Sequence, residues 1–500
     1  MIEFFIIVTC LLFATVFFFN FFNVIPQLLI IGFYPYAVAL TMVFAVLLFI
    51  SNFIKGQTGL LIIKIILSVL FILAFITLIL IWQNARQPNG YKKKYSDYIR
   101  QAEKLVDATG KSKGLEGIRN QGIATMIESS SGLPVTYNNQ VSLLTDPKHY
   151  FDEMIEEIKK AEHHVHILFY ITRDDKIGEK FKNALIQKAK EGVEVRFIYD
   201  ALGSFKLSKG YRNALEDAGV EIYPFNTVKH SLITGKLNNR IHRKMLIVDG
   251  NVAFTGGANL GDEYLGRDEN IGQWQDLLIK MKGESVNWLQ KIFLADWYYL
   301  TDQKLMDKVY YPKSSVEKEL PVQVVAGGFD TGWHEIQQKY FSLINAATER
   351  LYISTPYFVL NDAILEALQT AALRGVDVKI IVPDKTESFI IDWLNESFFP
   401  EILKSGVEIY MYSNGFLHTK AVVVDDEILS VGSSNLNMRS YYLDYELNVL
   451  IFNKELCNQM VEAIDRYIDK STRIKYKDYE RLSFTQKIRQ IIGRIILPMS

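Results

Sequence analysis

Apolar residues fill the first 85 positions almost without interruption. Three apolar runs, roughly 2–24, 28–54 and 60–82, are each long enough to cross a hydrocarbon core as a helix, which needs about 20 residues. Glu3 stands where a cleaved signal peptide has its basic region, so we expect the first run to be retained. A hairpin that enters the bilayer without crossing it is the alternative for the first two runs. The pattern predicts a membrane domain over 1–85 with two or three transmembrane helices.

Basic residues follow the last apolar run. They are Arg86, Lys92, Lys93, Lys94 and Arg100. A basic cluster just past a span marks the cytoplasmic side of a membrane and attracts anionic lipid headgroups, although it also serves as a simple anchor. We therefore expect a juxtamembrane basic linker over 86–131, in a multi-pass protein of the cell membrane whose catalytic domain lies on the cytoplasmic side.

From about residue 132 the patterns of helices and strands alternate, and the alternation occurs twice. The matched stretches are 150–171 with 340–358, 184–200 with 367–384, and 218–225 with 405–412. Helices alternating with strands predict an α/β fold with a largely parallel sheet covered by helices. We expect two similar halves, 132–310 and 320–475, packed with pseudo-two-fold symmetry.

One stretch that carries chemistry is present in both halves. "IHRKMLIVDGNVAFTGGAN" begins at Ile241, and "LHTKAVVVDDEILSVGSSN" begins 176 residues later at Leu417. Each contains His-x-Lys-x4-Asp and ends in asparagine: the residues are His242, Lys244, Asp249 and Asn259, and then His418, Lys420, Asp425 and Asn435. A single copy fits an ordinary buried strand and turn. Two copies in matched repeats favour a catalytic site.

The residue types suit a phosphate diester. Residues i and i+2 of a strand face the same way, so each histidine projects with its lysine. The lysines and the two asparagines can bind non-bridging oxygens, while one imidazole attacks phosphorus and the other protonates the leaving group. Asp249 and Asp425 belong to the same motif, but they lie at turns and off this face, so we expect them to brace the backbone. This chemistry needs no metal.

A nucleophilic imidazole needs a hydrogen-bond acceptor on its other ring nitrogen to fix the tautomer. An acidic residue follows each copy of the motif at a suitable distance. These residues are Asp276 in "WQDLLIKM" and Glu446 in "DYELNVLI". We interpret both as carboxylates that orient the histidines.

Composition narrows the range of functions. The net charge of −1 gives no overall basic footprint, and with the apolar runs it argues against a nucleic-acid partner. The only cysteines, Cys10 and Cys457, have no metal-binding spacing and offer no disulfide framework. His163, His164 and His166 cluster in sequence, but neighbours on a strand face opposite sides, so metal binding is disfavoured. We expect neither metal nor cofactor.

The duplicated motif resembles that of the phospholipase D superfamily, and within it the chain is similar to bacterial-type cardiolipin synthases. The stretches that carry this closer resemblance are "FIYDALGS" (197–204), "NNRIHRKMLIVDG" (238–250), "LADWYY" (294–299), "YISTPYF" (352–358) and "SSNLNMRS" (433–440). The resemblance implies transfer of a phosphatidyl group from one phosphatidylglycerol to a second, with release of glycerol. It also implies that His242 is the nucleophile and His418 the acid and base.

Other activities use the same residues. A phospholipase D-type hydrolase, or a transphosphatidylase with another alcohol acceptor, is the alternative, because the machinery does not choose between water and alcohol. A nuclease or a non-catalytic membrane scaffold fits less well, since both motifs are intact and the chain has apolar runs. The tail, 476–500, has apolar residues at helical spacing and predicts an amphipathic helix in the membrane interface, or one packed on the protein surface.

Overall fold

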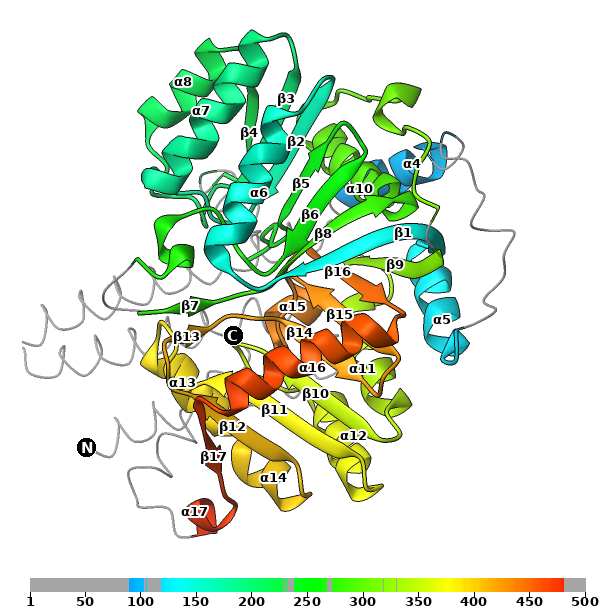
Figure 1. Ribbon diagram of the computed structural model, residues 1–500, viewed down its shortest axis with the longest axis vertical. Coiled ribbons are helices and arrows are strands. Elements are labelled where there is room, and N and C mark those ends of the chain that lie inside the picture. Colours follow the sequence, from blue (N-terminus) through cyan, green and yellow to red (C-terminus); the bar gives the residue numbers. More distant parts are fainter. Residues whose placement is uncertain are drawn as a thin grey trace, which may run out of the picture. The chain divides into compact units, whose positions relative to one another are not determined.

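The computed structural model describes residues 90–102, 105, 118–227, 229, 231, 238–267, 272–317, 319–329 and 331–480 (Figure 1). The three apolar runs and the tail beyond 480 lie outside these residues, so the expected membrane spans and amphipathic helix stay predictions. No helix within the described ranges is long and apolar enough to cross a bilayer.

A 15-stranded sheet runs through both halves. The first half supplies β1 (Val135–Leu144), β2 (His164–Phe169), β3 (Glu194–Asp200), β4 (Glu221–Phe225), β5 (Met245–Val248), β6 (Val252–Gly256) and β8 (Leu278–Gly283). The second half supplies β9 (Glu319–Gly327), β10 (Arg350–Ser354), β11 (Asp377–Pro383), β12 (Glu408–Tyr412), β14 (Ala421–Val424), β15 (Ile428–Gly432), β16 (Glu446–Ile451) and the edge strand β17 (Ser471–Ile474).

The strand order shows the internal repeat. Toward the middle of the sheet it is β4-β3-β2-β5-β6-β8-β1 in the first half and β12-β11-β10-β14-β15-β16-β9 in the second, where β17 adds one further strand outside β12. The halves meet where β1 pairs antiparallel with β9. Apart from β17, the two α/β halves therefore match strand for strand, as the repeats in the sequence predict.

The expectation of a largely parallel sheet is wrong. Parallel pairing within the described part of the large sheet is confined to β2-β3-β4 and β10-β11-β12. The tight turns at Asp249 and Asp425 join β5 to β6 and β14 to β15 as antiparallel hairpins. Both aspartates adopt a positive φ, 53° and 51°, which aspartate tolerates better than most side chains. Helix–strand alternation thus describes only the outer three strands of each half.

Helices cover the sheet in equivalent places (Figure 1). In the first half they are α6 (Pro147–Lys159), α7 (Lys176–Lys190), α8 (Lys209–Asp217) and α10 (Glu284–Thr301), with short 3-10 turns η2 (Asp262–Leu265) and η3 (Lys308–Tyr310). In the second they are α11 (Glu335–Ala346), α12 (Asp362–Leu373), α13 (Phe389–Glu396), α14 (Phe399–Lys404), α15 (Met438–Tyr442), α16 (Lys454–Ile468) and α17 (Lys477–Glu480). α10 follows β8 and packs on the first half's inner strands, as α16 follows β16 in the second.

The segment expected to be a linker, 86–131, contains two helices, α4 (Gly90–Ala102) and α5 (Gln121–Ser131). Tyr91 and Tyr98 recur at helical spacing, and both are fully buried where α4 packs on α10. The Tyr91 hydroxyl donates to Asp296 at 2.5 Å, and Arg243 donates to the same carboxylate at 2.7 Å. Because its aromatic face is buried, α4 is part of the folded domain rather than a linker.

Candidate active site

The two motif histidines occupy equivalent positions in the sheet. His242 lies just before β5, whose first residue, Met245, pairs with Leu168 at the end of β2. His418 lies just before β14, whose first residue pairs with Ser354 at the end of β10. Both histidines therefore lie beside the carboxyl ends of the parallel strands.

Each histidine is tied by its backbone to the opposite half. The His242 N–H donates to the Tyr445 carbonyl at 2.9 Å, and the His418 N–H donates to the Gln275 carbonyl at 2.8 Å. The second contact belongs to a short parallel ladder between β7 (Trp274–Gln275) and β13 (Phe416–Leu417). In both cases the next residue after the accepting carbonyl is the predicted carboxylate.

The carboxylates consequently pair with the histidines in a crossed arrangement. His242 Nδ1 lies 3.0 Å from both carboxylate oxygens of Glu446, which comes from the second half. His418 Nδ1 lies 2.6 Å from Oδ2 of Asp276, which comes from the first half. The sequence indicated both acidic residues, but not that each one serves the other half's histidine.

The protonation states follow from these contacts. Burial alone would raise the pKa of Glu446, but His242 and Lys244 together lower it to about 2. The pKa of Asp276 is also lowered overall: burial tends to raise it, and the contact with His418 is the main influence that lowers it. Both carboxylates are therefore ionised, so each Nδ1 carries the proton and donates it. The Nε2 lone pair of each imidazole is left for chemistry.

Burial also lowers the pKa of both histidines, in the case of His418 to about 3 with a further contribution from the charge of Lys420. The His242 side chain is 12% exposed and the His418 side chain 7%. Both imidazoles are therefore neutral at neutral pH, which is the state that a nucleophile requires.

Each motif lysine folds back onto its own histidine. Lys244 Nζ donates to the His242 carbonyl at 2.6 Å, and Lys420 Nζ donates to the His418 carbonyl at 2.7 Å. Burial lowers the pKa of Lys244 to about 7 and that of Lys420 to about 8. The charge of Lys420 contributes to the shift of Lys244, and Lys244 to that of His418. These mutual influences agree with the crossed imidazole–carboxylate contacts, which bring the two motifs together.

The two motif asparagines are buried beside this cluster. Asn259 Oδ1 accepts from the Ile171 N–H at 3.1 Å, and its amide donates to the Tyr264 hydroxyl at 3.0 Å. Asn435 Oδ1 has no hydrogen-bond partner among the residues described. The amide of Asn435 is thus less committed to the protein than that of Asn259.

The motif aspartates lie at the other end of β5 and β14. The Asp249 carboxylate accepts from the backbone N–H groups of residues 162–164 at 2.8–2.9 Å. The Asp425 carboxylate accepts from the N–H groups of residues 348–350 and from the Thr348 hydroxyl. These contacts hold each hairpin turn to the strand beside it and place both carboxylates away from the imidazoles.

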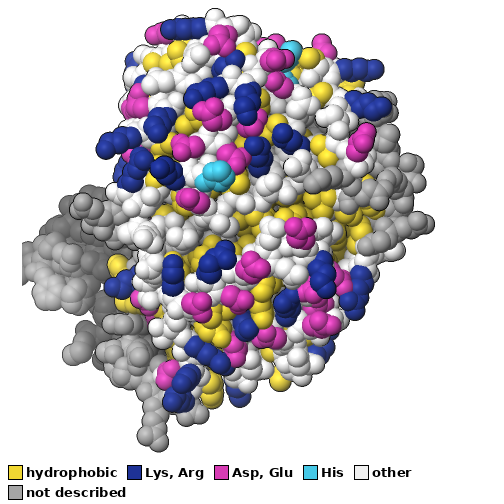
Figure 2. Space-filling model, viewed as in Figure 1, with side chains coloured by type: hydrophobic (Ala, Val, Ile, Leu, Met, Phe, Trp, Pro, Cys, Tyr) yellow, Lys and Arg dark blue, Asp and Glu magenta, His cyan; other side chains and the backbone are white. Residues whose placement is uncertain are grey.

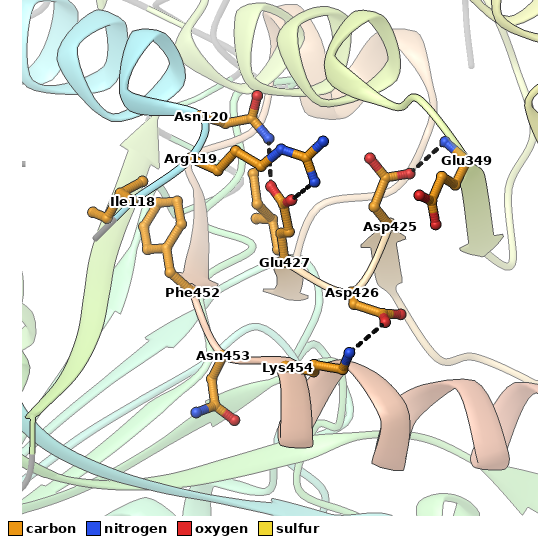
Figure 3. Close-up of a pocket in the computed structure, with 11 residues that line it drawn as sticks. Ile118, Arg119, Asn120, Glu349, Asp425, Asp426, Glu427, Phe452, Asn453 and Lys454 are labelled. Atoms are coloured by element: carbon orange, nitrogen blue, oxygen red, sulfur yellow. Dashed lines mark hydrogen bonds and ion pairs between the residues drawn. The ribbon is translucent and has the colours of Figure 1, made fainter. Parts of the chain in front are cut away.

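A cavity of about 590 Å³ lies at the Asp425 turn rather than at the histidines (Figure 3). Four of its charged side chains form ion pairs: Arg119 with Glu427, and Lys454 with Asp426. The described residues contain no group of three His, Cys, Asp or Glu side chains that could hold a metal ion. Acidic and basic side chains are mixed over the face that Figure 2 shows.

Several neighbours of the site were not predicted. The hydroxyls of Ser433 and Ser440 both donate to Glu446, the latter at 2.6 Å. The Tyr170 ring lies 4.9 Å from the His242 ring, and the Trp274 ring lies 4.9 Å from the His418 ring. Ser433 of "GSSN" stands in the second motif where the first has Gly257, so this difference between the two copies was the available signal for Ser433.

Comparison with known proteins agrees with this geometry. A family described as "Cardiolipin synthase, PLD-like domain" matches residues 154–297 and 340–468. Cardiolipin synthase 2 of Bacillus anthracis is 37% identical over 442 residues, which are 87% of this chain and 85% of that protein. The cardiolipin synthase of Geobacillus thermodenitrificans is 41% identical over 368 residues, 73% of each chain. That of Halalkalibacterium halodurans is 34% identical over 478 residues, 94% of each.

A solved structure shares the fold. The crystal structure of phosphatidylserine synthase from Haemophilus influenzae superposes with a TM-score of 0.59, covering 76% of this chain and 98% of that one. The sequence identity is 18%, so this likeness concerns the fold alone.

Proposed function

The chain belongs to the cardiolipin synthase family of phospholipase D-like proteins, and from this premise we propose that it makes cardiolipin from two molecules of phosphatidylglycerol, releasing glycerol. The observation that carries the proposal is the crossed pair of imidazole–carboxylate contacts, His242 with Glu446 and His418 with Asp276. Two neutral imidazoles with free Nε2 atoms supply one nucleophile and one acid–base group at a single phosphorus.

In the first step, His242 Nε2 attacks the phosphorus of one phosphatidylglycerol. A P–N bond forms, the P–O bond to the glycerol headgroup breaks, and His418 protonates the departing alkoxide. Before the substrate binds, His418 is neutral, because burial and the charge of Lys420 lower its pKa. The negative phosphodiester offsets that charge, so we expect the proton to be taken up together with the substrate.

In the second step, the terminal hydroxyl of another phosphatidylglycerol attacks the phosphatidyl-histidine. His418 accepts the hydroxyl proton, the new P–O bond forms, and the P–N bond to His242 breaks. Lys244, Lys420 and the amides of Asn259 and Asn435 bind the non-bridging oxygens and stabilise the charge that grows on them. The carboxylates of Glu446 and Asp276 keep both imidazoles in the required tautomer and stabilise their charged forms.

The location of the enzyme is part of the proposal. The substrates are lipids, and the apolar runs within 1–85 would hold the chain in the cell membrane with the catalytic domain on the cytoplasmic side. Anionic membrane lipids would then be its partners, and nucleic acid would not. Asp249 and Asp425 act through the backbone in this scheme and take no part in proton transfer.

The test is to incubate the full chain, reconstituted in vesicles, with phosphatidylglycerol labelled in both the phosphate and the glycerol headgroup, in the presence of a chelator. Labelled cardiolipin together with an equal amount of free glycerol supports the proposal. Phosphatidic acid as the main product would instead assign the alternative, hydrolysis by a phospholipase D-type reaction. A requirement for added metal would contradict the two-histidine chemistry.

A further inference from the structure

Two exposed phenylalanines occupy equivalent positions beside the active site. Phe205 follows the end of β3 by five residues and is 68% exposed, and Phe389 follows the end of β11 by six residues and is 63% exposed. β3 and β11 correspond to each other in the two halves, and their carboxyl ends lie at the same edge as the histidines. The two loops leave the sheet in the same way, because the N–H of Ala201 donates to Phe225 and that of Asp384 donates to Tyr412.

The loop that carries Phe205 is fastened directly to the site. Asp200 accepts from the N–H groups of Leu202 and Gly203 with one oxygen and from that of Ile241, next to His242, with the other. Gly203 packs so closely on Tyr170 that a Cβ would lie 2.4 Å from the Tyr170 carbonyl oxygen. The Tyr170 ring in turn contacts His242. The position of Phe205 is thus fixed relative to the nucleophile.

The second loop is held in a corresponding place. Asn395 of α13 accepts from the Phe358 N–H at 2.9 Å and donates to the Pro356 carbonyl at 3.4 Å. Residues 356–358 follow β10, as residues 170–173 follow β2. α13 buries only Leu394 and Asn395, although it begins Phe-Ile-Ile-Asp-Trp. Phe389 is the exposed apolar side chain of this helix, while Ile390, Ile391 and Trp393 are half-buried behind it.

We propose that these two tips, Phe205 with Leu202 and Phe389 with the first turn of α13, dock the catalytic domain onto the lipid bilayer that holds its substrate. The inference rests on the proposed function, since it supplies the surface from which a lipid phosphorus enters the site. Aromatic side chains suit the membrane interface, where the ring is apolar and the surroundings are polar. Burying one phenylalanine ring there favours the docked state by about tenfold or more.

Charge near the first tip fits a bilayer rather than a second protein copy. Lys206 and Lys209 are exposed beside Phe205, and basic residues next to an apolar anchor are attracted to anionic lipid. Asp384 and Glu387 lie near Phe389 together with Lys385, so the second tip contributes apolar contact without a basic excess. Charge neutralisation should therefore weaken docking through the first tip only.

A fluorescent label reads docking independently of turnover. In the full chain carrying Cys10→Ser, an environment-sensitive dye is attached to Phe205→Cys, Phe389→Cys or, as control, Leu373→Cys. Leu373 is 76% exposed and lies at the end of α12, just before β11 begins. It is therefore near the amino ends of the parallel strands, whereas the histidines lie near their carboxyl ends. The protein is placed in phosphatidylglycerol vesicles whose acyl chains carry bromine. We expect quenching of the dye at 205 and 389 at least about twice that at 373.

Equal quenching at all three positions would overturn the proposal. A second contradicting result is a dye at 205 or 389 that becomes shielded from water as the protein density in the vesicles rises, yet is not quenched by the brominated lipid. A second copy of the chain would then cover the tips. Both outcomes are readable even if the chain makes no cardiolipin, so a failure of this inference is distinct from a failure of the proposed function.

Activity gives the second readout. The Phe205→Ser, Phe389→Ser double variant should lose about tenfold or more of its rate on phosphatidylglycerol in vesicles, yet stay within about twofold of the parent on a short-chain, monomeric analogue. Leu373→Ser should change neither rate. Equal losses on both substrates would show that the tips serve the site itself rather than docking, and would overturn the inference.

Discussion

His242 faces both oxygens of Glu446 at 3.0 Å, whereas His418 contacts a single oxygen of Asp276 at 2.6 Å. Glu446 is held by two serine hydroxyls, from Ser433 and Ser440. Asp276 is held by the Leu277 N–H at 2.8 Å and the Trp274 indole at 3.3 Å. The duplicated fold thus places the two imidazoles equivalently, but each half surrounds its carboxylate with different donors.

The surroundings of the rings differ as well. His418 lies among aromatic rings, with Trp274 at 4.9 Å and Phe416 at 5.7 Å, and is the more enclosed of the two. His242 has Tyr170 on one side and more of its side chain exposed. An accessible imidazole suits attack on an incoming lipid phosphate, and an enclosed one suits proton transfer. The comparison therefore supports the proposed roles, which symmetry alone leaves open.

The largest effects are expected when the orienting carboxylates are changed. Glu446→Gln and Asp276→Asn should each lower kcat/KM by about 100- to 10,000-fold, because an amide can stabilise the wrong imidazole tautomer. The kcat/KM of the double variant should be scarcely lower than that of the less active single variant, since the two pairs act as one unit. Steady-state rates together with thermal unfolding measure this. If the two losses multiplied, the halves would be acting independently.

The motif aspartates should separate stability from catalysis. Asp249→Ala and Asp425→Ala each remove a carboxylate that accepts several backbone N–H bonds, which should lower the free energy of unfolding by about 2–4 kcal/mol. Chemical denaturation measures the loss. The kcat/KM of each folded variant should fall far less than that of Asp276→Asn, and an equal fall would make these aspartates catalytic.

Lowering the pH should remove the stabilisation that the Asp425 carboxylate gives to the folded state. Burial tends to raise the pKa of its carboxyl, but the N–H donors of residues 348–350 lower it overall. A folded-state pKa below the unfolded value means that the stabilisation is present at neutral pH and is lost as the pH falls below about 4. The difference in stability between the parent chain and Asp425→Ala should therefore shrink in acid.

The lysines predict an alkaline limit on activity. Burial lowers the pKa of Lys244 to about 7 and that of Lys420 to about 8, so phosphate binding in the free enzyme should weaken as the pH rises through this range. We expect kcat/KM to fall by about tenfold per pH unit above the first pKa. The residual activity of Lys244→Arg should persist to higher pH, because arginine stays charged. A flat profile to pH 9 would contradict this.

Removing the serine hydroxyls that donate to Glu446 should have the smallest effect on kcat/KM. Ser440→Ala and Ser433→Ala each remove one hydroxyl donor from Glu446, which should lower kcat/KM by about fivefold. Ser430→Ala, on β15 and without a hydrogen-bond partner for its hydroxyl among the described residues, is the matched control and should leave the rate unchanged. If the two serine variants matched this control, the difference in bracing between the halves would have no catalytic role.

Much of the site follows from sequence because it is repeated. His242 and His418, their lysines and the two carboxylates were all recognisable from residue type, order and spacing. The crossing of the pairs was not, since the contacts between Tyr445 and His242 and between Gln275 and His418 join segments far apart in the chain. A local sequence pattern does not predict which half supplies the carboxylate that contacts a given histidine. Ser433 and Ser440 were missed because buried serines are common. The replacement of Gly257 by Ser433 in the second copy was a signal for Ser433, whereas only its contact with Glu446 sets Ser440 apart.

The fold was predicted in outline. Periodicity located the two α/β halves, but it overestimated parallel pairing because the hairpins at Asp249 and Asp425 have the same short apolar strands as parallel units. The basic composition of 86–131 suggested a linker. The buried face of α4 depends on Tyr91 and Tyr98 meeting α10, roughly two hundred residues away, which a charge pattern cannot show.

The central claim is that His242 and His418, one from each half, act on one phosphorus with His242 as the nucleophile. The most direct measurement is to mix phosphate-labelled phosphatidylglycerol with full-length His418→Asn and His242→Asn, quench under denaturing conditions, and map the labelled peptide. Loss of His418 slows the formation of the phosphatidyl-histidine and also its breakdown, so we predict that acid-labile label slowly accumulates on the peptide that contains His242 in the first variant, and that none appears in the second. Label retained in His242→Asn, or found on His418, would contradict the account.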